Sequence, residues 1–128
     1  MKILLDTCAF LWIITDDPKL SQQARKLFID LENEVYLSVA STWEIAIKYK
    51  LGKLPLPQPP QQYIPSKRKQ HDIDSLPLDE DATLYLTKLP DLHKDPFDRI
   101  LICQAVVAGL MILTPDELIT QDPVRSVW

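Results

Sequence analysis

Four acidic residues stand where strands are expected to end or helices to begin. Asp6 follows one short apolar run, and Asp116 follows another. Glu44 and Asp98 lie in segments expected to start two helices. Carboxylates in such places can converge on one edge of a sheet, where their oxygens suit a hard divalent cation. A site of this kind supports metal-assisted hydrolysis of a phosphodiester.

The donor atoms available in these segments discriminate between metals. Oxygen ligands alone suit Mg²⁺ or Mn²⁺, whereas zinc sites take closely spaced His and Cys. His71 and His93 are isolated, and the alternating acids with a central glycine of a calcium loop are absent. With only two glycines, the chain cannot form a phosphate-cradling glycine loop or a dinucleotide fold. It also has no serine-centred nucleophile elbow.

Helix capping is the alternative explanation for three of these acids. Ser41 with Glu44 fits a capping box. Asp95, followed by proline, fits an N-cap with Asp98 in the first turn, and Asp116 could cap a short helix. A cap contributes about 1 kcal/mol, and Ser or Thr serves equally well. Each acid taken alone fits capping at least as well as catalysis, but capping also places the acids at helix N-termini, so the two explanations are compatible.

Asp6 has no comparable duty beyond the start of the next helix. It follows an apolar strand and has apolar neighbours, including Trp12. Burying an ionised carboxylate beside other acids is unfavourable unless a cation compensates. The four acids together therefore indicate a shared metal site.

The apolar pattern predicts alternating strands and helices. The expected strands lie within residues 2–5, 35–38, 73–78, 111–114 and 124–128. The expected helices cover residues 10–14, 21–33, 41–51, 61–70, 80–89 and 96–110, with N-caps at Ser21 and Ser41 and glycines near two C-termini. Four prolines among residues 54–60 indicate a turn or an extended connector.

This alternation predicts an α/β fold, with a mostly parallel sheet of four to five short strands and helices on both faces. Right-handed crossovers return each helix antiparallel to its strands. Helix N-termini then gather at the carboxyl edge of the sheet, which places all four acids on one rim. At 128 residues we expect a single domain, residues 1–128.

Composition predicts a cytoplasmic protein with no membrane partner. No apolar run approaches the length of a membrane span, and Asp6 interrupts the first apolar stretch before a signal peptide could form. Cys8 and Cys103 both have apolar neighbours, so we expect buried free thiols.

The net charge of −4 argues weakly against nucleic acid as a partner, because phosphate binding usually shows as a basic surface. Bound cations would neutralise part of the acidic charge, and local potential matters more than net charge. The basic residues form two clusters: Lys48, Lys50 and Lys53, and Lys67, Arg68 and Lys69. Each cluster alone also fits a solvated helix face.

Five short motifs occur in order along the chain. They are Leu5-Asp6-Thr7, Trp43-Glu44-Ile45-Ala46-Ile47-Lys48, His93-Lys94-Asp95-Pro96-Phe97-Asp98-Arg99, Leu113-Thr114-Pro115-Asp116 and Val124-Arg125-Ser126-Val127-Trp128. In these motifs the chain resembles the PIN domain family and, within it, the VapC-type ribonuclease toxins of toxin–antitoxin pairs. The resemblance covers essentially the whole chain, and its most specific piece is the Asp-Pro-Phe-Asp-Arg block. It implies a PIN-like three-layer sandwich.

The resemblance also implies roles for individual residues. The family's catalytic, metal-binding acids correspond to Asp6, Glu44, Asp98 and Asp116. Asp95 is an additional acid nearby, either a cap or a support for the ligands. Thr7 and Thr114 match small hydroxyl positions that support ligands or water, and Cys8 falls where relatives commonly carry another residue, often His.

The implied activity is a metal-dependent endoribonuclease using one or two Mg²⁺ ions, or Mn²⁺ in their place. The first three acids would be the main ligands, and Asp116 would bind a second ion or orient the water. Because the 2′-hydroxyl is not the nucleophile, we expect 5′-phosphate and 3′-hydroxyl ends. Arg99 and Lys48 are candidate phosphate contacts, with ion pairing on a helix surface an equal alternative for each.

The implied partners are RNA, a cognate antitoxin that covers the rim, and a second copy of the chain, for which exposed apolar residues of the early helices would serve. Two alternatives stay open. One is a catalytically silent PIN-like module that binds RNA or a partner without cutting, although the intact acidic set argues against it. The other is a small metal-dependent phosphatase that acts on free nucleotides.

Overall fold

Five parallel strands form the centre of the fold, in the order β3-β2-β1-β4-β5. They are β1 (Lys2–Leu5), β2 (Glu34–Ser38), β3 (Asp74–Leu76), β4 (Met111–Leu113) and β5 (Ser126–Val127). The structure, a computed structural model, describes residues 1–90, 95–120 and 124–128, so His93 lies outside the described residues. The predicted parallel sheet is confirmed, and every strand pair within it is parallel.

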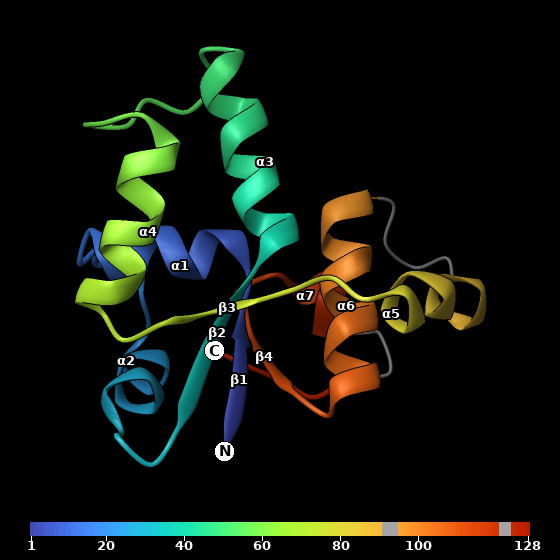
Figure 1. Ribbon diagram of the computed structural model, residues 1–128. Coiled ribbons are helices and arrows are strands. Elements are labelled where there is room, and N and C mark those ends of the chain that lie inside the picture. Colours follow the sequence, from blue (N-terminus) through green and yellow to red (C-terminus); the bar gives the residue numbers. More distant parts are fainter. Residues whose placement is uncertain (91–94, 121–123) are drawn as a thin grey trace.

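Helices cover both faces of this sheet (Figure 1). On one side lie α1 (Thr7–Ile14), α2 (Gln22–Ile29) and α4 (Pro60–Gln70). On the other lie α5 (Glu80–Leu84), the 3₁₀ helix η1 (Tyr85–Lys88), α6 (Pro96–Ala108) and α7 (Glu117–Thr120). Helix α3 (Val39–Lys50) continues from the end of β2 and projects beyond the sheet beside α4. In the part of the chain that the structure describes, no helix has the length and apolar character needed to cross a membrane.

Alternation along β1 divides the core into two layers. Ile3 and Leu5 pack into the apolar cluster that includes Phe10 of α1. Leu4, between them, packs into the opposite cluster with Ile102 of α6. Because successive side chains of a strand point to opposite faces, a fully buried strand joins both layers. The predicted three-layer arrangement is therefore confirmed.

The main correction to the predicted elements concerns α3, which begins at Val39 rather than at Ser41. Ser38 is its N-cap, with Oγ accepting a hydrogen bond from the backbone N–H of Ala40 at 3.0 Å. The strand therefore passes directly into the helix with no intervening loop. Ser41 lies inside α3 and is fully buried.

Three other predicted helices differ at their ends. Helix α1 begins at Thr7, since Asp6 caps it, and α2 ends at Ile29, since Asp30 is extended. The predicted helix over residues 80–89 divides into α5 and η1. Helix α6 begins at Pro96 as predicted and ends at Ala108. Its C-cap is Gly109, whose φ of 69° is the left-handed conformation that glycine adopts without strain.

The prediction that both cysteines are buried is wrong for one of them. Cys103 is buried in α6, but Cys8 is exposed, and both are free thiols. Cys8 lies in the first turn of α1, two residues after Asp6, and it feels the charges of the acids of the rim. Apolar neighbours in the sequence did not reveal this, because the first turn of a helix still has one face on the surface.

Candidate functional site

Asp6 connects the end of β1 to the start of α1. Its Oδ1 caps the helix by accepting a hydrogen bond from the Ala9 N–H at 2.6 Å, and its own N–H donates to the Leu113 carbonyl at 3.2 Å. Its other oxygen, Oδ2, accepts a short hydrogen bond from the buried Thr114 hydroxyl. The Asp116 N–H donates to Thr114 Oγ1 at 3.0 Å. The residues that follow β4 are therefore linked to the Asp6 carboxylate through the Thr114 hydroxyl.

The pKa of Asp6 is raised to about 6. Burial is the largest cause, since the residue is 5% exposed and the charged form loses its hydration. Hydrogen bonds from Thr114 and Ala9 lower the pKa, and the charges of Asp116 and Glu44 raise it. Burial and the two neighbouring acids thus outweigh two favourable hydrogen bonds, which is what a cation would compensate.

Glu44 faces the same rim from α3. It is 6% exposed, and its Oε1 accepts a hydrogen bond from the Thr7 hydroxyl at 2.7 Å. Thr7 Oγ1 also lies 3.0 Å from Ser41 Oγ. Oε2 accepts from Lys48 Nζ at 2.7 Å. The predicted capping box is therefore wrong: Ser38 caps α3, and Glu44 bonds to a residue of α1 instead of to its own helix start.

Asp95 and Asp98 begin α6 on the same side. Asp95 is the N-cap, as the capping alternative predicted, and its Oδ1 accepts from two backbone N–H groups of the first turn at 2.9 and 3.4 Å. Asp98 is half-buried in that turn. Cys8 has an exposed surface, but its thiol is partly enclosed by protein, and this partial burial is the largest cause that raises its pKa. The charges of Asp6, Glu44 and Asp98 raise the pKa further. Three of the predicted acids therefore act on one thiol.

Two basic residues were predicted near the acids. Lys48 forms an ion pair with Glu44, four residues earlier on α3. The pKa of Lys48 is raised, chiefly by its hydrogen bond to Glu44 and also by the charges of Glu44 and Asp95, with burial opposing. The ion-pairing alternative thus holds for Lys48, although its partner is an acid of the rim. Arg99 is half-buried in the first turns of α6.

The donor set fits a hard divalent cation, but the side chains are not arranged around one. Among the described residues, no group of three or more His, Cys, Asp and Glu side chains could hold a metal ion as it stands. All four carboxylate oxygens of Asp6 and Glu44 accept hydrogen bonds from protein groups. Each of these oxygens still has a second lone pair that a metal ion could use. Ligation would then require only small side-chain shifts and the departure of Lys48 from Oε2.

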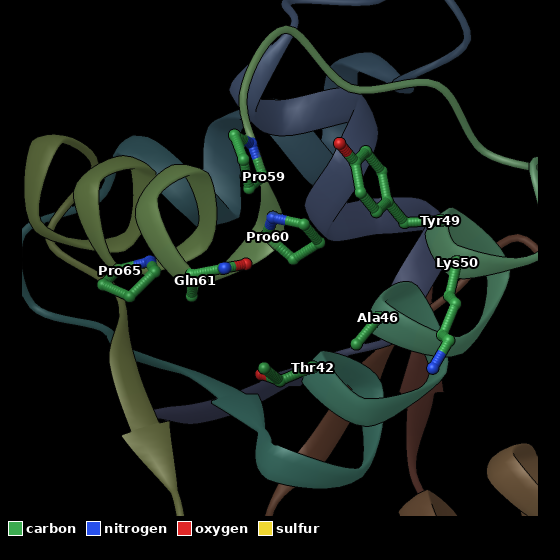
Figure 2. A pocket seen from close by; sticks show the side chains of 8 residues that line it. All are labelled: Thr42, Ala46, Tyr49, Lys50, Pro59, Pro60, Gln61 and Pro65. Carbon is green, nitrogen blue, oxygen red and sulfur yellow. The ribbon is translucent and has the colours of Figure 1, made fainter.

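A hollow of about 550 Å³ lies between α3 and α4, away from the acids (Figure 2). It is lined by Thr42, Ala46, Tyr49 and Lys50 of α3 and by Pro59, Pro60, Gln61 and Pro65. Residues 42, 46 and 49 recur on one face of a helix, and residues 44 and 48 on another. This groove is therefore separate from the rim that carries Glu44.

A second hollow, of about 520 Å³, lies beside the rim, between the first turns of α3 and α6. Its lining carries no charged residue. Trp43 and Phe97 meet there edge to face with ring centroids 5.7 Å apart, and Trp43 is 64% exposed. Each aromatic residue directly precedes a predicted acid in the sequence.

Two polar residues that structure the site are missing from the predictions. Ser38, the cap of α3, has a sequence signal, since a serine directly after an apolar strand is a common N-cap. Gln104 is 3% exposed, and its signal is a lone amide in the apolar helical run of residues 100–108. Both side chains are hydrogen-bonded to each other, at 2.5 Å.

One known protein is similar in sequence to part of this chain. Ribonuclease VapC16 from Mycobacterium tuberculosis is 40% identical over 63 residues, which are 49% of this chain and 45% of that protein. The chain thus spans under half the length of this curated relative.

Solved structures share the fold over nearly the whole chain. VapBC2 from Rickettsia felis, bound to a DNA fragment from its promoter, superposes with a TM-score of 0.67 at 14% identity, covering 99% of this chain and 98% of that one. DNA-bound VapBC from Salmonella typhimurium superposes with a TM-score of 0.69 at 16% identity, covering 99% and 97%. Such low identities show similarity of fold. The family model described as PIN domain matches residues 3–122, and the chain therefore belongs to the PIN domain family.

Proposed function

We propose that this chain is a metal-dependent endoribonuclease that acts as the toxin of a toxin–antitoxin pair. The observation that carries the proposal is the buried carboxylate of Asp6, which meets the charges of Glu44 and Asp116 on a rim shared with Asp98. The family match and the partial likeness to a ribonuclease support it. The resemblance of the whole fold to VapBC proteins supports the toxin role.

Asp6, Glu44 and Asp98 would hold Mg²⁺, with Mn²⁺ as the alternative ion, and Asp116 would hold a second ion or orient the attacking water. A divalent ion at such a site polarises a phosphate oxygen and lowers the pKa of a bound water. Thr114 and Thr7 hold the Asp6 and Glu44 carboxylates in place.

Positive charge at the rim would orient the phosphate. Lys48 can turn towards RNA once Glu44 ligates an ion, because its side chain is about half exposed, at 49%. Arg99, one residue after Asp98, is the second candidate for this contact. Asp95 fixes the first turn of α6 on which Asp98 lies.

The proposed products are 5′-phosphate and 3′-hydroxyl ends. Water is the nucleophile in this mechanism, and the leaving group is the 3′-oxygen. End analysis of the cut RNA tests this point, and a 2′,3′-cyclic phosphate would rule the mechanism out.

The decisive experiment is cleavage of a pool of cellular RNA with Mg²⁺, with Mn²⁺ and with EDTA. Asp6→Asn keeps a cap for Ala9 but removes the charge, so we expect cutting to be lost. Asp74→Asn is the matched control, because Asp74 is an exposed acid of β3. Cutting in EDTA, or equal cutting by the Asp6 variant, would refute the proposal.

Two alternative functions predict different outcomes. A silent binding module would bind RNA without cutting it in every metal, using protein verified to be free of antitoxin. A nucleotide phosphatase would release inorganic phosphate from a mononucleotide and leave long RNA intact. The buried acid beside two further acids favours the nuclease over the silent module, which has no need of this unfavourable grouping.

We also propose two protein partners, an antitoxin and a second copy of the chain. The antitoxin follows from the likeness to VapBC proteins. For the homodimer, exposed apolar residues are available on the early helices, Ile29 on α2 and Val39 and Trp43 on α3. Light scattering at micromolar concentration tests the dimer, and a monomer would refute it.

Cytoplasmic location and a single domain spanning residues 1–128 complete the proposal. The sheet order supports one domain, because β1 from the first residues and β4 from the last third are hydrogen-bonded neighbours. Cell fractionation and a single cooperative unfolding transition test these two points.

A further inference from the structure

We infer that Gln104 is a positioning residue that sets the separation of Glu44 and Asp98 by tying α6 to the start of α3. The inference rests on the proposed nuclease function. Gln104 lies on α6, 3% exposed, six positions after Asp98. Its side chain joins three segments that are far apart in the sequence.

The contacts of the amide are complete. Oε1 accepts a hydrogen bond from the Ser38 hydroxyl at 2.5 Å, and Nε2 donates to the Pro77 carbonyl at 3.1 Å. Ser38 is itself fully buried, and its Oγ accepts from the Ala40 N–H at 3.0 Å. One side chain of α6 thus holds both the N-cap of α3 and the segment that follows β3.

The chemistry of this position calls for an explanation beyond packing. An apolar side chain of similar size would fill the site without desolvating an amide. A buried amide whose oxygen and nitrogen are both hydrogen-bonded fixes the positions of its partners relative to one another, because its hydrogen bonds are made in one geometry only. The helix around it is otherwise apolar from Ile100 to Ala108, so the amide is the one polar side chain in that run.

The direction in which α3 leaves Ser38 determines the position of Glu44. Since β2 passes into α3 without a loop, the direction of α3 is set at Ser38. Glu44 lies six residues further on, about 9 Å along the helix axis. Asp98 lies the same number of residues before Gln104 on α6. Figure 1 shows α3 leading away from the end of β2 while α6 runs back along the sheet. The hydrogen bond between Ser38 and Gln104, called the bridge below, is thus six residues from Glu44 on one helix and six residues from Asp98 on the other.

The distance along α3 from Ser38 to Glu44 makes the bridge important for the proposed reaction. A tilt of α3 by about 5° at Ser38 would move Glu44 by roughly 0.8 Å, given a lever of about 9 Å. Ligand geometry tolerates only about 0.5 Å. Loss of the bridge would therefore disturb the spacing of two ligands while leaving the core apolar and folded.

The test uses Gln104→Met, which keeps the length of the side chain and removes both hydrogen bonds. Ile102→Val, in the same helix and also fully buried, is the control for a general loss of stability. Binding of Mn²⁺ alone is measured by electron paramagnetic resonance, and RNA cleavage is measured at saturating Mn²⁺. We expect Gln104→Met to weaken Mn²⁺ binding about 10-fold and to lower kcat with little change in KM. Ile102→Val should retain both values.

A second variant keeps the inference testable if Gln104→Met does not fold. Ser38→Gly removes the hydroxyl that bonds Gln104, and glycine remains an acceptable N-cap. The same loss of Mn²⁺ affinity is expected. Wild-type-like Mn²⁺ binding in a folded Gln104→Met or Ser38→Gly variant would overturn the inference, and the nuclease proposal would stand. A wild-type chain that neither binds Mn²⁺ nor cuts RNA would instead refute the nuclease proposal itself.

Discussion

Replacing Lys48 by methionine should tighten metal binding and slow the reaction, two effects of opposite sign. Lys48 Nζ lies 2.7 Å from Glu44 Oε2, the oxygen that it must release under the proposed metal ligation. Methionine keeps most of the apolar stem and removes the competing ammonium. The metal then no longer has to displace an ion pair.

The magnitude follows from the exposure of the pair. The Glu44 side chain is 8% exposed but the Lys48 side chain is 49% exposed, so solvent screens much of the attraction. Partly exposed ion pairs contribute up to about 1 kcal/mol, which corresponds to about a fivefold change in Kd. We therefore expect Mn²⁺ to bind Lys48→Met about fivefold more tightly, as measured by titration calorimetry on the metal-free protein.

Lys50→Met is the matched control, because Lys50 lies on α3 but lines the groove against α4. It should leave Mn²⁺ affinity unchanged. Lys48→Met should also cut RNA more slowly at saturating metal, since the proposed phosphate contact is lost. Unchanged or weaker Mn²⁺ binding by Lys48→Met would refute the idea that this ammonium competes with the metal.

Three further predictions concern stability. The pKa of Asp6 is about 6 in the folded chain against 3.8 unfolded, so between these pH values the folded state holds a proton that the unfolded state has lost. The free energy of unfolding of the metal-free chain should therefore fall by about 3 kcal/mol as pH rises through that interval. Urea titrations at several pH values should show this slope for the wild type and lack it for Asp6→Asn. Thr114→Val removes the hydroxyl that donates to buried Asp6 and should lower stability by about 1–3 kcal/mol; the pKa of Asp6 in nuclear magnetic resonance titration should rise, and an unchanged pKa would contradict the assigned hydrogen bond. Asp95→Ala removes the N-cap of α6 and should lower the melting midpoint by the equivalent of about 1 kcal/mol, whereas Asp95→Ser should retain it.

The order of elements and the rim of acids could be predicted from local patterns, because apolar runs alternate with helical segments along the whole chain. The boundary between β2 and α3 could not. Val39 and Ala40 are apolar and continue the strand pattern, and Ser38 and Ser41 are equally good caps by residue type. Only the hydrogen bond from Ala40 distinguishes them. Placing the cap at Ser41 made a capping box the alternative explanation for Glu44, whereas its carboxylate accepts a hydrogen bond from Thr7, 37 positions away.

The same reasoning explains the other misses. The exposure of Cys8 depends on which side of the first turn of α1 faces the rim, and apolar neighbours along the chain carry no such information. The break between α5 and η1 lies within a continuous apolar pattern that fits either type of helix. The bridge made by Gln104 joins positions 66 and 27 residues apart, and contacts at such separation have no local signature.

The hydrogen bond between Thr114 and Asp6 spans 108 positions of the chain. During synthesis, Asp6 and Glu44 leave the ribosome long before β4 exists to fold Thr114 and Asp116 around them. A growing chain therefore carries an incomplete rim and an unsupported Asp6. On the proposed nuclease function, a fragment that ends before β4 should therefore not cut RNA.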